Sequence, residues 1–206
     1  PMAWRLLMRR CPTRSMTLVG DVAQTGALAG AASWQRVLEP YVGDRWRLEE
    51  LTVSYRTPAE IMALAGDVLA EIDPTLTPPT SVRATGVPPT TDEVPRSALP
   101  DRLTEAVRAA VTEVGDGRVG VIVPAGLVDE LAPSVVRAEP DAAFGDDPEL
   151  LSRVVLVTVA QAKGLEFDSV LLVDPDRIVA ESPRGRNDLY VALTRATQRL
   201  RILRPV

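Results

Sequence analysis

The stretch Val157-Thr-Val-Ala-Gln-Ala-Lys-Gly-Leu-Glu-Phe-Asp-Ser-Val170 has the pattern of a buried strand that runs into a glycine-containing turn. Its Lys163 is the only lysine in the chain, against 22 arginines. A lysine carries a compact point charge, whereas an arginine carries a planar fork, so a lone lysine indicates a position where the point charge is wanted. The alternative is that it stands there by chance. The residues around it decide whether the stretch is functional.

Apolar runs of strand length alternate with helical patterns on both sides of this stretch. Strands that alternate with helices predict a parallel α/β sheet covered by helices on both faces. Frequent prolines between residues 73 and 100 predict a long surface loop with one edge strand. The predicted strands are 16–19, 47–53, 118–123, 154–159, 170–173 and 200–203, and the predicted helices are 2–10, 31–38, 58–69, 101–114, 125–131 and 187–198.

The chain contains no histidine and a single cysteine, Cys11. Without histidine, Ser-His-Asp and Cys-His nucleophile pairs are excluded, and so is nearly every zinc arrangement. A single cysteine forms no internal disulfide, and no apolar run approaches the ~20 residues that a membrane-spanning helix needs. We therefore expect a cytoplasmic protein with no membrane segment and no metal site of its own.

The net charge of −5 is opposite to the basic footprint of a protein whose main task is to grip nucleic acid. Arginines nevertheless gather near both ends of the chain, where they fit either solvated helix faces or a local basic strip. Nucleic acid is therefore a weakly supported partner. These arginines are Arg5, Arg9, Arg10, Arg14, Arg195, Arg199, Arg201 and Arg204.

Three polar clusters follow predicted strands: Gly20-Asp21, Ser54-Tyr55-Arg56 and Ala160 to Glu166. Parallel α/β sheets bind ligands beyond the carboxyl ends of their strands. We therefore predict that the clusters meet at the carboxyl edge of the sheet and form a site. The alternative is that they are ordinary turns.

Four stretches occur in a fixed order: Leu18-Val-Gly-Asp-Val-Ala-Gln24, Leu51-Thr-Val-Ser-Tyr-Arg-Thr-Pro58, Val157 to Phe167, and Leu189-Tyr-Val-Ala-Leu-Thr-Arg-Ala196. They resemble motifs III, IV, V and VI of the UvrD/Rep/PcrA-like superfamily 1 helicases. Within that superfamily, Trp4-Arg-Leu-Leu-Met-Arg-Arg-Cys-Pro-Thr-Arg-Ser-Met-Thr-Leu-Val-Gly-Asp-Val-Ala-Gln-Thr25 is similar to HelD, the helicase-like factor that acts on bacterial RNA polymerase.

The chain contains no Gly-x-x-x-x-Gly-Lys-Ser/Thr phosphate loop, because Lys163 is followed by Gly164 and Leu165. In the family this loop and the magnesium-binding carboxylates precede motif III. The resemblance therefore implies that residues 1–32 are the end of a first RecA-like domain. Residues 33–206 would form the second, a three-layer parallel sheet with helices on both faces and the Pro-rich loop 73–100. The missing first domain, which would hold the phosphates and Mg²⁺, is then a required partner.

In the family ATP lies between the two RecA-like domains, and arginines of the second domain reach its γ-phosphate. Arg56 and Arg195 match these arginine fingers, which stabilise the charge that develops on the transferred phosphoryl group. The alternative for both is an ordinary surface arginine paired with an acid. Gln24 matches the glutamine that senses the γ-phosphate.

The remaining candidates would bind the rest of the nucleotide. Tyr55 matches the tyrosine that stacks on adenine, with core packing as the alternative. Glu166 matches the acid that accepts from the ribose hydroxyls, and Gly164 lets the backbone approach the nucleotide. We place Lys163 at the same cleft, in contact with phosphate or with the other domain.

Two departures from the family weaken a DNA-unwinding role. Residues Ala27-Leu-Ala-Gly30 stand where strand-separating relatives carry an aromatic that stacks on bases. Only residues 124–153 lie between two predicted strands where those relatives insert a large domain.

We therefore expect the C-terminal motor domain of a HelD-like, ATP-dependent factor that remodels or recycles RNA polymerase. The chain alone should not hydrolyse ATP. The alternatives are the second motor domain of a DNA-unwinding UvrD-like helicase and a non-catalytic module that binds a protein.

Overall fold

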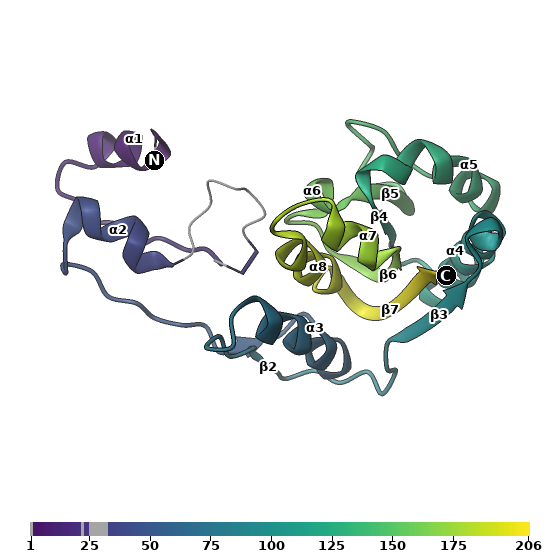
Figure 1. The fold of residues 1–206 in the computed structure, drawn as a ribbon, viewed down its shortest axis with the longest axis horizontal. Coiled ribbons are helices and arrows are strands. Elements are labelled where there is room, and N and C mark those ends of the chain that lie inside the picture. Colours follow the sequence, from purple (N-terminus) through teal and green to yellow (C-terminus); the bar gives the residue numbers. More distant parts are fainter. Residues whose placement is uncertain (1, 22, 25–32) are drawn as a thin grey trace.

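The computed structural model describes residues 2–21, 23–24 and 33–206 (Figure 1). Its main body is a five-stranded sheet with the strand order β3-β7-β6-β4-β5, in which every pair of neighbours is parallel. The strands are β3 (Thr90–Val94), β4 (Val119–Val123), β5 (Val154–Thr158), β6 (Phe167–Val173) and β7 (Ala196–Pro205).

Helices cover both faces of this sheet, as the sequence predicted. On one face lie α3 (Ala59–Ile72), α6 (Val159–Ala162), α7 (Pro175–Ala180) and α8 (Gly185–Leu193). On the other lie α4 (Leu99–Val114) and α5 (Val128–Ala138). The prediction of a three-layer α/β fold is therefore confirmed.

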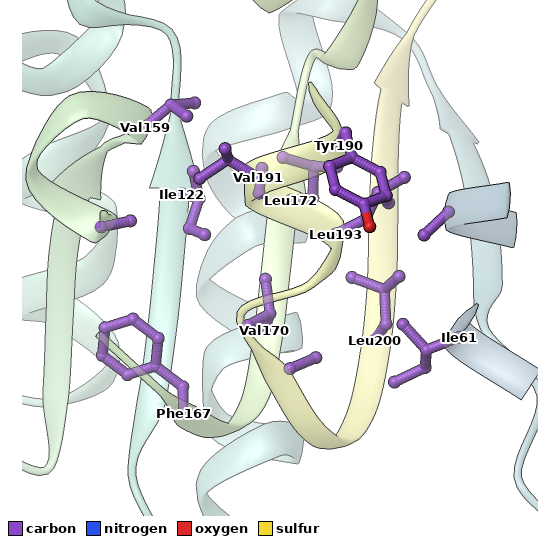
Figure 2. Packing of buried hydrophobic residues seen from close by; sticks show 14 of the residues in the cluster. Ile61, Ile122, Val159, Phe167, Val170, Leu172, Tyr190, Val191, Leu193 and Leu200 are labelled. Carbon is purple, nitrogen blue, oxygen red and sulfur yellow. The ribbon is translucent and has the colours of Figure 1, made fainter. Parts of the chain in front are cut away.

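Alternating side chains of the buried strands supply the two halves of the core. Along β6, Val170 and Leu172 pack on the α3–α8 face, whereas Leu171 and Val173 pack on the α4–α5 face. Figure 2 shows the first half, in which Tyr190 of α8 belongs to the same cluster as Leu172 and Ile61. Strands buried on both faces explain the near-continuous apolar runs in the sequence.

Gly120 makes room for the ring of Phe167 on the neighbouring strand. A Cβ at Gly120 would lie 2.4 Å from Cδ2 of Phe167, far inside van der Waals contact. Phe167 is 2% exposed and is the first residue of β6, so its ring anchors the start of that strand. The glycine in β4 therefore fixes how β6 begins.

The N-terminal part of the chain runs outside this body. The helices α1 (Met2–Arg10) and α2 (Trp34–Val42) lie apart from the sheet, at the left of Figure 1. The oxygen of Ser33 caps α2 by accepting from the N–H of Arg36 at 3.3 Å. Helix 2–10 is confirmed, and helix 31–38 is confirmed with its centre shifted toward the C-terminus.

Two predicted strands of this part are wrong. Residues 16–19 form no strand, and of residues 47–53 only Val53 does, in β1 (Val53–Ser54). A strand needs a neighbour for its N–H and C=O groups, and β1 finds one in β2 (Thr80–Ser81), whereas no described strand pairs with residues 16–19. The apolar pattern of residues 16–19 permits a strand, but no strand in the described part of the chain lies beside it.

The Pro-rich segment 73–100 holds one edge strand of the main sheet, as predicted. This strand is β3, which pairs with β7. A 3-10 turn, η1 (Arg96–Ala98), then leads into α4, which begins at Leu99, so Asp101 lies in the first turn and not at the cap. A second 3-10 turn, η2 (Ala125–Leu127), precedes α5.

Helix 187–198 is shorter than predicted. The helix α8 ends at Leu193, and β7 begins at Ala196 instead of residue 200. The pairing of Phe167 with Ala196 draws these residues into the sheet and overrides their helical pattern.

Candidate functional site

Four of the seven predicted site residues, Gln24, Arg56, Glu166 and Arg195, are linked near the amino edge of the main sheet. Glu166 immediately precedes β6, and Arg195 immediately precedes β7. The backbone N–H of Phe167 donates to the carbonyl of Arg195 at 3.0 Å, which joins the two strand starts. The predicted carboxyl-edge site is therefore wrong. Residues 159–166 cross back from the carboxyl end of β5 to the amino end of β6, so the polar residues at the end of this crossover lie at the opposite edge.

Arg195 is buried in spite of its charge, with 2% of its surface exposed. Its Nε donates to the carbonyl of Val191 at 3.0 Å and its Nη1 to the carbonyl of Leu165 at 3.3 Å. The Nη2 group donates to the hydroxyl of Thr194 at 3.2 Å and to Oε1 of Gln24 at 3.2 Å. Every nitrogen of the guanidinium thus has an acceptor, which makes its burial tolerable.

Gln24 is held between a carboxylate and this guanidinium. Its Nε2 donates to Oδ2 of Asp21 at 2.9 Å, while Oδ1 of the same carboxylate accepts from the N–H of Ala23 at 2.8 Å. Nδ2 of Asn187 on α8 donates to the carbonyl of Ala23 at 2.8 Å. The segment that carries Gln24 is therefore held at two points, by Asn187 of α8 and by Arg195 two residues after the end of that helix.

Arg56 and Glu166 form an ion pair across 110 residues, with 2.6 Å between Nη1 and Oε1. Both side chains are about half exposed, at 41% and 47%. The Nε atom of Arg56 is buried and has no hydrogen-bond partner in the described chain. Pairing with an acid was the alternative to the finger role, and the structure shows this pair.

The other three candidates are exposed at the surface. Tyr55 is 73% exposed, so it does not pack in the core. Lys163 is exposed, and Gly164 adopts the left-handed backbone (φ +82°) that only glycine accommodates easily. The turn that brings Glu166 to the strand start therefore depends on this glycine.

Burial and neighbouring charges act on two titratable groups of the site. Burial, followed by the charge of Arg56, lowers the pKa of Arg195, while Glu166 and Asp21 oppose this shift. Burial, followed by the charge of Asp21, raises the pKa of Tyr190. The guanidinium of Arg195 thus interacts electrostatically with one further cation and two anions: Arg56, Glu166 and Asp21.

A cavity of about 1260 Å³ lies among the N-terminal segments, α3 and residues 75–80, and it reaches the end of α8. Its lining includes Tyr55, Arg56 and Gln24, together with Tyr190 and Thr194 of the α8 region. The other predicted site residues do not line it: Lys163, Gly164, Glu166 and Arg195. Guanidinium, amide and aromatic groups on one wall match phosphate and base recognition. The Nε of Arg56 is a further donor without an acceptor in the described chain, and because it is buried, an anion reaches it only when the guanidinium moves.

Sequence reasoning missed Asn187 and Tyr190. Residues three or four positions apart lie on the same face of a helix. Val191 and Asn187 of α8 lie four and eight residues before Arg195, which follows the helix. Counting back from Arg195 would have found Asn187. The stretch Ala27 to Gly30, interpreted as a lost base-stacking platform, lies outside the described residues, as does the predicted domain boundary at residue 32.

Among the residues the structure describes, no three Asp, Glu or Cys side chains come together as a metal site. The neighbouring acids Asp129 and Glu130 lie in the first turn of α5 and belong to no such group. None of the described helices is both long and apolar enough to span a membrane.

Residues 153–203, from β5 to β7, match the family model of the UvrD-like helicase C-terminal domain. Comparison with curated proteins gave no match. This part of the chain is therefore similar to a helicase C-terminal domain, and it includes Lys163, Gly164, Glu166 and Arg195.

Among solved structures, the chain is similar to the C-terminal domain of a possible DNA helicase from Lactobacillus plantarum WCFS1. The two are 19% identical with a TM-score of 0.57, and the match covers 74% of this chain and 88% of the other. The helicase of PRRSV is 20% identical over 80% of this chain, but that match spans 25% of the viral chain with a TM-score of 0.41. The first comparison shows that the fold is that of a RecA-like helicase C-terminal domain.

Proposed function

We propose that this chain supplies the arginine-bearing, nucleotide-facing edge of an ATP site in a helicase-like motor. Arg56 and Arg195 would act on the γ-phosphate, Gln24 would sense it, and Tyr55 and Glu166 would bind the adenine and the ribose. Lys163 and Gly164 complete the rim of the site. A first RecA-like domain would supply the phosphate loop and the carboxylates that hold Mg²⁺. When bound, ATP with Mg²⁺ supplies the phosphoryl group that is transferred.

The observation that carries this proposal is the convergence of Gln24, Arg56, Glu166 and Arg195 at one edge of the sheet. They come from four stretches that are widely separated in sequence, two of them outside the region matched by the family model. A donor set of two guanidinium groups and one amide is suited to a charged phosphoryl group, which is stabilised electrostatically.

We further propose that the motor is a HelD-like factor that remodels or recycles RNA polymerase in the cytoplasm. The support for this is the similarity of Trp4 to Thr25 to HelD, and the acidic balance of the chain, which favours a protein partner. Binding of the full-length protein to purified RNA polymerase, with release of stalled polymerase in the presence of ATP, is the expected result. Absence of binding would remove the RNA polymerase assignment.

A DNA-unwinding motor is the second candidate. The solved domain from Lactobacillus plantarum is described as part of a possible DNA helicase, and α1 carries exposed Arg5, Arg9 and Arg10 with no acidic residue. ATP-dependent separation of a DNA duplex by the full-length protein would favour this candidate over the first.

The proposed nucleotide role is tested by ATP turnover. In the full-length protein, Arg195→Ala should lower kcat by about 10³-fold or more, the usual value of an arginine finger, with a smaller effect on nucleotide binding. Arg199→Ala offers the simplest matched control, because its side chain is partly exposed and, among the described residues, its ion-pair partner is Glu113 at 3.6 Å. The chain alone should show no Mg²⁺-dependent turnover. If Arg56→Ala and Arg195→Ala both leave turnover intact, the chain is a binding module and not a catalytic edge.

A further inference from the structure

The ion pair between Arg56 and Glu166 conflicts with the roles proposed for its two members. Glu166 is proposed to bind the ribose, and Arg56 the γ-phosphate. In a nucleoside triphosphate two further phosphates separate these groups, so a guanidinium that stays paired with the ribose-binding carboxylate is held away from the γ-phosphate. In the structure, however, Nη1 of Arg56 lies 2.6 Å from Oε1 of Glu166.

Glu166 is the fixed member of this pair. Its carbonyl accepts from Nη2 of Arg118 at 3.3 Å, and the carbonyl of the preceding Leu165 accepts from Nη1 of Arg195 at 3.3 Å. The next residue, Phe167, begins β6 and is buried. The carboxylate is thus carried by the rigid start of a central strand.

Arg56 is the movable member. It lies in a bend after the two-residue strand β1, outside the main sheet. In the described chain its guanidinium pairs with Glu166 through Nη1. Its Nε is buried and has no hydrogen-bond partner there. Moving the guanidinium therefore breaks one ion pair and gives Nε the chance of an acceptor.

The charges at the site are already balanced. They therefore favour a ligand that replaces Arg56 as the partner of Glu166 over a ligand that only adds negative charge. Arg56 and Arg195 are balanced by Glu166 and Asp21, which act on the same guanidinium of Arg195. If a phosphate group alone binds Arg56, the Glu166 carboxylate loses its cationic partner. A sugar hydroxyl can donate to that carboxylate and compensate for the departing arginine.

We propose that Glu166 works as an exchange switch that makes phosphate binding by Arg56 depend on the sugar of the ligand. Without ligand it holds Arg56; the hydroxyls of a ribose then replace Arg56 and release the guanidinium to the phosphates. This inference rests on the proposed nucleotide site and goes beyond it, because it couples recognition of the sugar to recognition of the phosphate. Glu166 thereby becomes a specificity-determining residue.

The switch is tested by titrating this chain with three probes without Mg²⁺: inorganic tripolyphosphate, ATP and 2′,3′-dideoxyATP. Binding to the wild type, Glu166→Gln, Arg56→Ala and the double variant is measured by calorimetry or NMR at low salt. Glu113→Gln is the matched control, since it removes the same charge from an acid that pairs with Arg199 and Arg201 on another surface.

Glu166→Gln should bind tripolyphosphate more tightly than the wild type by roughly 1.5- to 5-fold, the range expected for a half-exposed ion pair. Glu113→Gln should not, and the gain should vanish when Arg56→Ala is added. The wild type should prefer ATP to dideoxyATP, and Glu166→Gln should lose this preference. Unchanged tripolyphosphate affinity in Glu166→Gln, or a gain equal to that of Glu113→Gln, overturns the switch.

The same titration separates this inference from the proposed function. If the wild type binds the probes and Arg56→Ala weakens binding, but Glu166→Gln brings no gain, the nucleotide site stands and the switch is wrong. If no variant binds any probe in a way that depends on Arg56, the switch is wrong, and the proposed function is then decided by the turnover of Arg56→Ala in the full-length protein.

Discussion

Nη2 of Arg195 donates a hydrogen bond to Oε1 of Gln24 at 3.2 Å, although 171 residues separate them in the chain. The same segment is held a second time, where Nδ2 of Asn187 donates to the carbonyl of Ala23 at 2.8 Å. Both donors belong to the α8 region, so α8 orients the N-terminal segment against the amino edge of the sheet. In a motor of the proposed kind, movement of one part would reach the other through these two contacts.

Arg195 should contribute to folding stability as well as to the site. Arg195→Ala leaves the carbonyl of Leu165 and other acceptors without a donor, which should cost about 1–3 kcal/mol of unfolding free energy. Arg199→Ala removes an exposed arginine and should cost about 0–1 kcal/mol. Urea unfolding of the two variants checks this, and equal losses would contradict the buried network.

Gly120 should tolerate no larger residue. Gly120→Ala places a methyl group 2.4 Å from the Phe167 ring, and overpacking of this kind should cost about 1–3 kcal/mol. Gly126→Ala is the matched control, because its methyl would meet only the mobile end of Arg177, at 2.9 Å. Thermal unfolding should rank Gly120→Ala well below Gly126→Ala; similar midpoints would argue against tight packing of Phe167.

Gln161 should tie the start of α6 to the acidic loop beside it. Its Oε1 accepts from the N–H of Thr158 at 2.9 Å, and its Nε2 donates to the carbonyl of Gly145 at 2.7 Å. Gln161→Ala should lower stability by about 1 kcal/mol, as loss of a cap does, and speed hydrogen exchange at Thr158. Gln35→Ala, which removes the same side chain from an exposed site on α2, should change neither. Unchanged exchange in Gln161→Ala would refute the cap.

Glu60 should make one loop sensitive to acid. Its carboxylate accepts from the N–H of Gly86 at 2.7 Å and of Thr85 at 3.3 Å. Hydrogen bonds from its own backbone N–H and then from Gly86 lower the pKa of Glu60 below its ordinary value of 4.5. A lowered pKa means that the stabilisation is complete above pH 4.5 and is lost as the pH falls through the folded-state pKa.

The amides of Thr85 and Gly86 report this transition in NMR spectra. Their protection factors, which compare the observed exchange rate with the intrinsic rate at the same pH, should fall on acidification below pH 4.5 in the wild type and should be low at every pH in Glu60→Ala. Asp67→Ala removes another carboxylate of α3 and serves as the control. An acid response that persists in Glu60→Ala would assign the effect to another group.

The buried strands were predictable because their composition reflects burial on two faces. Runs such as Val119 to Val123 and Val154 to Thr158 are apolar at nearly every position, which a strand between two helical layers requires. The strand prediction at residues 16–19 failed because a pattern indicates that a segment can pair, but not whether a neighbour is present. The end of α8 was misplaced for a related reason, since pairing with β6 draws Ala196 into the sheet.

The local sequence carried the identity of the candidate residues, because motif spacing and residue chemistry are local properties. It thus marked Arg56, Glu166 and Arg195 as chemically suited to a nucleotide. Their placement at the amino edge, the pairing of Arg56 with Glu166 and the contact of Arg195 with Gln24 follow from the folded chain. These contacts join residues that are 110 and 171 positions apart in the chain. Whether such residues meet in space depends on the direction of the crossover before β6 and on the packing of α8. No local pattern encodes them, because they arise when separate elements bury their apolar faces together.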